Sequence, residues 1–342
     1  MLRVDSRFQN ITMGAMDAAT SQFPQILAYA APLFFAAVVL EFLFIRLRKK
    51  HVGEAARGRY ENKDALASMS MGLGNLISDI RMGFISLALM MWMWQFRLFD
   101  WGVGLGAFFA CLLAQDFVYY YKHYAAHRIR WFWSAHVVHH SSEHYNLSTA
   151  LRQPWNNHFT GFILMSSPLV LLGFHPLLVA FVGGVNLTYQ FWIHTETIDR
   201  MPKWFEAIFN TPSHHRVHHS TNPRYLDANF AGIFIIWDRA FGTFVEERAD
   251  DPCRYGVVKP IETYNPVKIA FAELLQIFRD AAQRGLTLRQ RFGYVFGPPG
   301  YSHDGSRKMS VDLKREFVAK HPETAGQQGL ILKTAQTDFS AE

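Results

Sequence analysis

The sequence is poor in cysteine, with only Cys111 and Cys253 among 342 residues. Two thiols cannot form a disulfide framework or a four-thiolate metal site. The H-E-x-x-H helix of zinc hydrolases and the G-x-S-x-G turn of serine hydrolases are also absent. Residues 1–24 lack an apolar stretch beside a basic start, so we expect no cleaved secretory signal.

Charged residues are scarce as well, at 18% of the chain, whereas half of the residues are hydrophobic. The net charge of +6 would suit nucleic acid, anionic lipid headgroups or the positive-inside bias of membrane proteins. Long apolar runs favour the two membrane explanations. We therefore expect a membrane environment and no nucleic acid partner.

The clearest candidate for a membrane-spanning helix covers residues 26–46. About 20 apolar residues are needed to cross a hydrocarbon core of about 30 Å. Glu41 interrupts this run, which is costly in lipid unless the carboxyl group faces other helices. A basic cluster ends it and predicts a cytoplasmic location for that end; the cluster consists of Arg46, Arg48, Lys49, Lys50 and His51.

Two further apolar runs, residues 82–96 and 103–121, are joined by the short link Arg97–Trp101. They predict a helical hairpin, and tryptophan and tyrosine near its ends suit the membrane interfaces. The second run leads directly into His123. We therefore expect the histidines to emerge on the cytoplasmic side.

A later apolar stretch, residues 159–193, is interrupted by Gly173–Pro176 and ends at His194. Each half is short for an upright span, so a second hairpin dipping into the membrane is expected. The predicted fold is an all-α integral membrane protein with about four to five transmembrane helices and a cytoplasmic, histidine-rich di-metal domain. The predicted segments are an N-terminal segment at 1–25, transmembrane helices at 26–122, the catalytic domain at 123–250 and a polar C-terminal region at 251–342.

Histidine is concentrated in one part of the chain. Thirteen of the 16 histidines lie between His123 and His219, where an even distribution would place about four or five. Eight of these follow three spaced patterns, H-x3-H, H-x2-H-H and H-x2-H-H. These eight are His123, His127, His136, His139, His140, His215, His218 and His219.

Residues three or four apart on a helix share a face, so each pattern can direct several imidazoles at one ion. A single zinc takes about four ligands, and eight suit two ions. Imidazole binds iron, zinc, copper and nickel, so a membrane zinc enzyme or metal-binding protein stays open as an alternative. Isolated histidines are expected to be packed or exposed residues; they are His51, His144, His158, His175, His303 and His321.

The three patterns resemble those of the fatty acid hydroxylase and sterol desaturase superfamily of membrane di-iron enzymes. Longer segments are similar to the subgroup of that superfamily that cleaves alkylglycerol ethers. These segments are residues 140–152, 189–196, 210–219, 229–232, 236–239 and 241–244. One departure is Arg128, which stands where that subgroup carries an acidic residue.

The resemblance implies that the eight patterned histidines are catalytic metal ligands. It also implies a further ligand from an intervening helix, for which His194 is the candidate, with Gln190 and His214 as weaker ones. Metal-bound histidines usually donate their second N–H to a carboxylate or carbonyl. Candidates for that orienting role are Glu143, Glu196 and Asp227.

The implied activity is hydroxylation of a lipid C–H bond by molecular oxygen with two iron ions. The resembled subgroup implies that the hydroxylated position is the ether-adjacent carbon of an alkylglycerol. The alternative is hydroxylation or desaturation of a sterol, a fatty acyl chain or an aminolipid. Electrons would come from an external reductant or redox partner, with tetrahydrobiopterin as the candidate donor. We expect a multi-pass membrane protein located in the bacterial inner membrane, or in the endoplasmic reticulum of a eukaryote.

Overall fold

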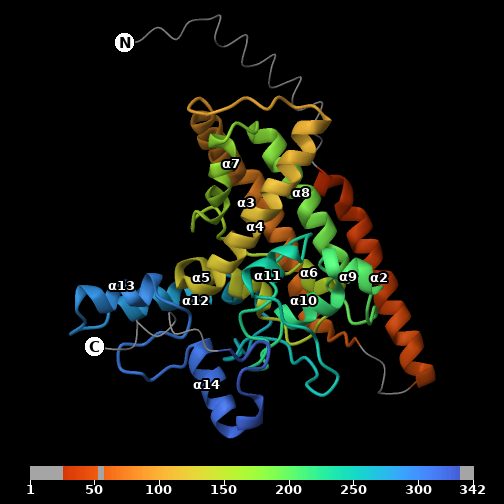
Figure 1. Cartoon of the computed structure of the whole chain (residues 1–342), viewed down its shortest axis with the longest axis vertical. Coiled ribbons are helices and arrows are strands. Elements are labelled where there is room, and N and C mark those ends of the chain that lie inside the picture. Colours follow the sequence, from red (N-terminus) through yellow and green to blue (C-terminus); the bar gives the residue numbers. More distant parts are fainter. Residues whose placement is uncertain (1–25, 53–57, 332–342) are drawn as a thin grey trace, which may run out of the picture.

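The computed structural model describes residues 26–52 and 58–331 of the chain (Figure 1). The expected N-terminal segment 1–25 and the side chains of Lys49, Lys50 and His51 lie outside this part. Within the described ranges every regular element is a helix, and only isolated β-bridges occur besides. The expectation of an all-α fold is confirmed for these residues.

Four long helices run roughly along the long axis of the molecule (Figure 1). They are α2 (Ile26–Val52), α3 (Asn62–Trp94), α4 (Leu105–Arg128) and α8 (Pro176–Trp192). Helix α8 packs against both α2 and α4. By length and hydropathy, Tyr29–Arg48 of α2 and the whole of α3 could cross a membrane. Both present large apolar side chains such as Leu33 and Ile80 to the outside, as helices in contact with lipid do.

The residues of both expected hairpins lie mostly in helices. Helix α3 begins about 20 residues before the apolar run that predicted it, and α4 follows after a short link. The second hairpin contains η2 (Phe162–Ser166), α7 (Ser167–Leu171) and α8. It reverses at Gly173, whose φ of +104° and contact with the Phe99 carbonyl leave no room for a β-carbon.

The remaining helices gather at one end of the long helices (Figure 1). They are α5 (Arg130–His140), α6 (Leu147–Ala150), α9 (Lys203–Ile208), α10 (Pro212–His218), α11 (Ile236–Phe241), α12 (Pro266–Ala281), α13 (Leu288–Phe296), α14 (Ser310–Lys320) and η3 (Pro322–Thr324). Ile129 adopts an extended conformation between α4 and α5. This single residue turns the chain sharply, so the histidines at the end of α4 face those of α5.

A buried ion pair ties α3 to the segment that follows α5. The Arg152 guanidinium donates to Asp64 Oδ1 at 2.7 Å, and Ser142 Oγ donates to Asp64 Oδ2 at 2.6 Å. Arg152 Nε also donates to Ser141 Oγ at 2.9 Å. Both charged residues are almost fully buried. Breaking such a pair is costly because the remaining charge stays in a medium that solvates it poorly.

We therefore expect Asp64→Ala to lower the free energy of unfolding by about 3–5 kcal/mol, because it leaves the Arg152 guanidinium buried without its counter-charge. The measurement is thermal unfolding of the detergent-purified chain. Asp100→Ala is the control, since it breaks the partly exposed pair with Arg97 and should cost less than about 1 kcal/mol. Equal losses in the two variants would contradict the assigned role.

Candidate metal centre

Nine histidines converge in two adjoining groups beneath the long helices. The first group contains His123, His127, His136, His140 and His218, and the second contains His139, His194, His215 and His219. Within each group the available ring nitrogens lie within 4.8 Å of one another. The rings of His140 and His219 stack at 4.3 Å, so the two groups are in contact.

The helical spacing explains how each pattern divides between the groups. On α5, His136 and His140 lie four residues apart and face the first group, whereas His139 faces the second. On α10 the division is reversed, because the four-apart pair His215 and His219 faces the second group. Each three-histidine pattern therefore contributes to both groups, because its two adjacent histidines, at i+3 and i+4, point about 100° apart around the helix.

His194 completes the second group from the end of α8. Its Nε2 lies 3.1 Å from the Nε2 atoms of both His139 and His215. Its Nδ1 lies 2.7 Å from the Gln190 carbonyl one helical turn earlier. The structure thus brings together all eight patterned histidines and the ninth that the resemblance implied.

Main-chain carbonyls orient four of the imidazoles. A carbonyl accepts only from a protonated nitrogen, so Nδ1 carries the hydrogen in these rings and Nε2 presents a lone pair to the centre. The four contacts are His123 Nδ1 to Phe230 O at 2.8 Å, His139 to Arg152 O at 3.3 Å, His194 to Gln190 O at 2.7 Å and His218 to Ala228 O at 2.9 Å.

Of the three carboxylates that the sequence suggested for orienting a histidine, Asp227 is the one that lies beside an imidazole. Its Oδ1 is 3.4 Å from His127 Nδ1, and its Oδ2 is 3.6 Å from the Arg128 guanidinium. Burial raises the pKa of Asp227, but Arg128 and His127 outweigh it and hold that pKa below the ordinary value. Arg128, the departure from the resembled subgroup, thus supports the anion beside His127.

The arrangement of nitrogens fits a pair of metal ions. At a metal–nitrogen distance of about 2.0–2.1 Å, adjacent ligands of one ion lie about 3 Å apart. His136 Nε2 lies 2.8 Å from that of His123 and 3.0 Å from that of His140. The Nε2 atoms of His127, His218 and His219 are buried with no hydrogen-bond partner in the described chain.

Buried polar atoms without partners are costly, and ligation removes that cost. The donor set consists of nitrogen atoms alone, which suits iron and zinc equally well. Burial lowers the pKa of His139 to about 4, so this imidazole is neutral at pH 7. A neutral ring keeps its lone pair available for a cation.

Other candidate residues lie apart from the imidazole groups. His214 belongs to neither group, and its ring packs against Phe244 at 5.2 Å. Glu143 is exposed, and Glu196 accepts hydrogen bonds from Gly58 N and Tyr255 OH. The Gln190 side chain accepts from Tyr119 OH, so only its main-chain carbonyl touches a histidine.

Two buried aspartates hold the loop that carries Phe230. Asp238 accepts hydrogen bonds from the amides of Phe230 and Ala231, both at 2.8 Å. Asp116 of α4 accepts from Ile233 N at 2.7 Å and from Trp237 Nε1 at 3.0 Å. They fix the carbonyl that orients His123. The only sequence signal for Asp116 is an acidic residue within an apolar run.

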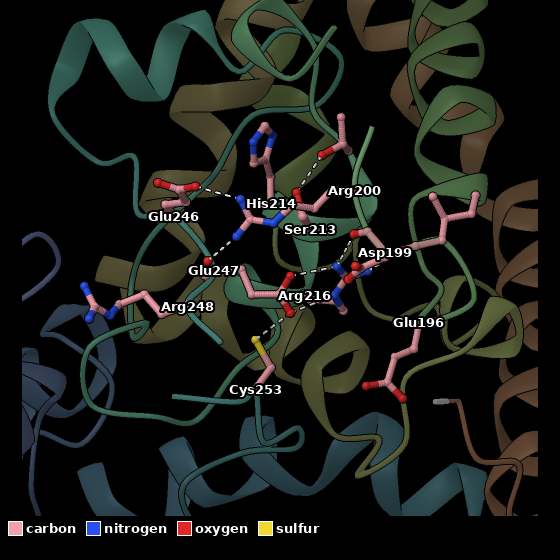
Figure 2. A network of polar contacts seen from close by, with 12 residues as sticks. Glu196, Asp199, Arg200, Ser213, His214, Arg216, Glu246, Glu247, Arg248 and Cys253 are labelled. Carbon is pink, nitrogen blue, oxygen red and sulfur yellow. Dashed lines mark hydrogen bonds and ion pairs between the residues drawn. The ribbon is translucent and has the colours of Figure 1, made fainter. Parts of the chain in front are cut away.

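Arg216 links α10 to the loop after His194 (Figure 2). Its guanidinium donates to the Ile198 carbonyl at 2.7 Å and to Glu247 Oε2 at 2.7 Å. It also donates to the Thr195 carbonyl at 3.2 Å. This network holds His194 against His215, the residue before Arg216. No spacing rule in the sequence marks this role.

The comparisons with known proteins cover the same region. The family described as fatty acid hydroxylase matches residues 108–243, which include all nine histidines. The alkylglycerol monooxygenase of Homo sapiens is 37% identical over 311 residues, 90% of this chain and 65% of that protein. The Danio rerio alkylglycerol monooxygenase is 37% identical over 259 residues, 74% of this chain and 55% of that protein.

A more distant relative is the cholesterol 25-hydroxylase of Homo sapiens, 30% identical over 142 residues, 39% of this chain and 49% of that protein. The chain thus spans less than two thirds of the length of these relatives. No solved structure matches it. The chain thus contains a fatty acid hydroxylase domain at residues 108–243, and over most of its length it is similar to the alkylglycerol monooxygenases.

Proposed function

We propose that this chain is a membrane-bound, oxygen-dependent lipid hydroxylase with a di-iron centre. The observation that carries the proposal is the division of nine buried imidazoles into two adjoining groups. The family and the alkylglycerol monooxygenase homologues support hydroxylation of a lipid. The same observations weigh against a single-zinc hydrolase, which needs about four ligands.

In this proposal each group of histidines holds one iron ion. Iron held there would supply the activation of molecular oxygen that hydroxylation of an unactivated C–H bond requires. Asp227 and the four main-chain carbonyls keep the imidazoles oriented. Phe230 and Tyr145, both fully buried, pack against the two groups and exclude water, which protects a reactive centre from side reactions.

A groove between α2 and α8 supports access of a lipid chain from the bilayer. It encloses about 530 Å³ and is lined mainly by apolar side chains, among them Leu33, Phe34 and Phe191. Glu41 and Thr195 supply its polar side, and Thr195 directly follows His194. We assign the hydrocarbon chain of the substrate to the apolar part and a hydroxyl-bearing headgroup to the polar side.

The substrate that we favour is an alkylglycerol, hydroxylated on the carbon bonded to the ether oxygen. The product would be a hemiacetal, which collapses to an aldehyde and a glycerol. A sterol, fatty acyl chain or aminolipid is the alternative, and the more distant cholesterol 25-hydroxylase relative supports the sterol. Electrons would come from an external donor, for which tetrahydrobiopterin is the candidate implied by the resemblance.

We further propose a multi-pass arrangement with spans within residues 26–122 and a catalytic domain at 123–250 that returns to the membrane at 159–193. Arg46 and Arg48 near the end of α2 favour a cytoplasmic location for the histidine groups. A bacterial inner membrane or an endoplasmic reticulum would meet this requirement. Residues 251–342 form the polar C-terminal region, to which α12, α13 and α14 belong.

The first test is metal content. Protein from iron-replete cells should contain about two irons per chain, because eight or nine imidazoles suit two ions. His139→Ala and His218→Ala, one from each group, should lower iron content and reduce activity at least 100-fold. His321→Ala is the control, since that half-exposed ring contacts Phe317 and Glu323 and belongs to neither histidine group. One tightly held zinc with no iron would refute the proposal.

The second test follows the oxygen atom. Reconstituted enzyme should transfer one atom of ¹⁸O₂ to an alkylglycerol, and rapid chemical reduction of the aldehyde would trap the label as a labelled alcohol. Parallel assays with a sterol and an acyl lipid distinguish the substrate classes by mass spectrometry. Product formation without oxygen, or label derived only from water, is the result that would exclude an oxygenase.

The third test concerns Asp227. Asp227→Asn removes the negative charge beside His127 and Arg128, and such changes typically cost 10–100-fold in metal affinity or activity. Iron affinity measured by chelator competition should fall by this amount. Glu143→Gln changes an exposed carboxylate of the same domain and should leave iron affinity unchanged. Equal affinity in both variants would mean that Asp227 does not support the site.

A further inference from the structure

Helix α12 carries a second apolar stripe that points away from the protein core. Its inner face buries residues such as Ile269 and Ala270 against α3 and α5. Val267, Leu275 and Phe278 lie on another face and are each about half exposed. Their spacing of eight and three residues places them on one side of the helix. This side of α12 is therefore amphipathic in its own right.

Helix α13 continues this apolar surface. Leu288, Phe292 and Phe296 recur every four residues and are exposed, Leu288 to 85%. Trp131 of α5 joins the two helices, with its ring 6.2 Å from that of Phe278 and 6.3 Å from that of Phe296. We call these residues the α12–α13 apolar surface: Val267, Leu275, Phe278, Leu288, Phe292 and Phe296.

The α12–α13 apolar surface is continuous with a helix that could span the membrane. The Trp131 ring lies 5.9 Å from that of Phe159, which is 61% exposed. The neighbouring His158 contacts Asp79 and Ser86 of α3, each at 2.9 Å. The aromatic contact therefore lies beside α3, where its apolar half begins, as expected of interfacial aromatic residues. Helices α12 and α13 lie across the direction of the long helices (Figure 1).

Cationic side chains surround the same surface. Four cationic residues are exposed and form no ion pair within the described part of the chain: Lys268, Arg279, Arg284 and Arg289. Lys268 and Arg279 directly follow the stripe residues Val267 and Phe278. Long basic side chains beside an apolar stripe can reach headgroups while their stems stay in apolar contact.

We propose that α12 and α13 lie in the headgroup region of the bilayer and bind anionic phospholipids. The apolar surface would enter the acyl boundary, and the four cations would contact lipid phosphates, as in interfacial amphipathic helices. The proposal requires a membrane location but does not depend on the reaction. Arg130 of α5 pairs with Asp280 of α12 at 2.8 Å, so a bilayer-bound α12 would also hold the helix that carries His136 and His139.

The first arm of the test measures lipid contact in the full-length protein in nanodiscs of phosphatidylcholine and phosphatidylglycerol. A fluorophore on Phe292→Cys should be quenched by nitroxide-labelled phospholipid at least threefold more than one on Ala319→Cys of α14. Unmodified protein provides the background, since Cys111 is buried and Cys253 partly so. Equal quenching would overturn the proposal. Shielding of position 292 from both lipid nitroxide and iodide would also overturn it, by indicating a second protein copy there.

The second arm measures the preference for anionic lipid. A triple variant removes three of these charges through Arg279→Gln, Arg284→Gln and Arg289→Gln. It should lower the ratio of phosphatidylglycerol to phosphatidylcholine bound to the protein by about fivefold for each charge removed. The matched control removes three cations near α14, through Lys308→Gln, Arg315→Gln and Lys320→Gln, and should leave the ratio unchanged. Equal ratios in the two triple variants, measured by native mass spectrometry, would overturn the assignment.

Discussion

The structure depends on one constraint, the burial of nine imidazoles whose ring nitrogens converge in two adjoining groups. Buried neutral nitrogen atoms about 3 Å apart are stable only where a proton donor or a metal ion binds their lone pairs. Several Nε2 atoms have no hydrogen-bond partner among the described residues. Metal ligation would remove this cost, so folding of the centre and metal binding are expected to be coupled.

The surrounding chain fixes the direction of each ring. Carbonyls of residues such as Phe230 and Ala228 accept from Nδ1 and leave Nε2 for the centre. Behind them, Asp238 holds the amide of Phe230, and Asp116 holds the following loop to α4. The His123 ring is thus connected through a short chain of contacts to Asp116 of α4, which limits how far its nitrogen can move.

The buried ion pairs have a related role in the helix packing. The Arg152 guanidinium binds Asp64 of α3, while the Arg152 carbonyl accepts from His139. On the other side of α5, Arg130 binds Asp280 of α12. Two charged contacts therefore fix α5 between a helix that could span the membrane and an amphipathic helix. The proposed centre would lie where membrane helices and surface helices meet.

The sequence by itself determined the all-α class, the long apolar helices and the patterned histidines, because helical spacing and hydropathy are local properties. The family resemblance added His194. Only the tertiary structure decided that His139 separates from His136 and His140, since this depends on how α5 and α10 face each other. It also decided which carboxylate reaches an imidazole: Asp227 does, whereas Glu196 binds Gly58 and Tyr255. Contacts between residues distant in sequence, such as those of Arg216 and Asp116, follow from packing, and no local pattern specifies them.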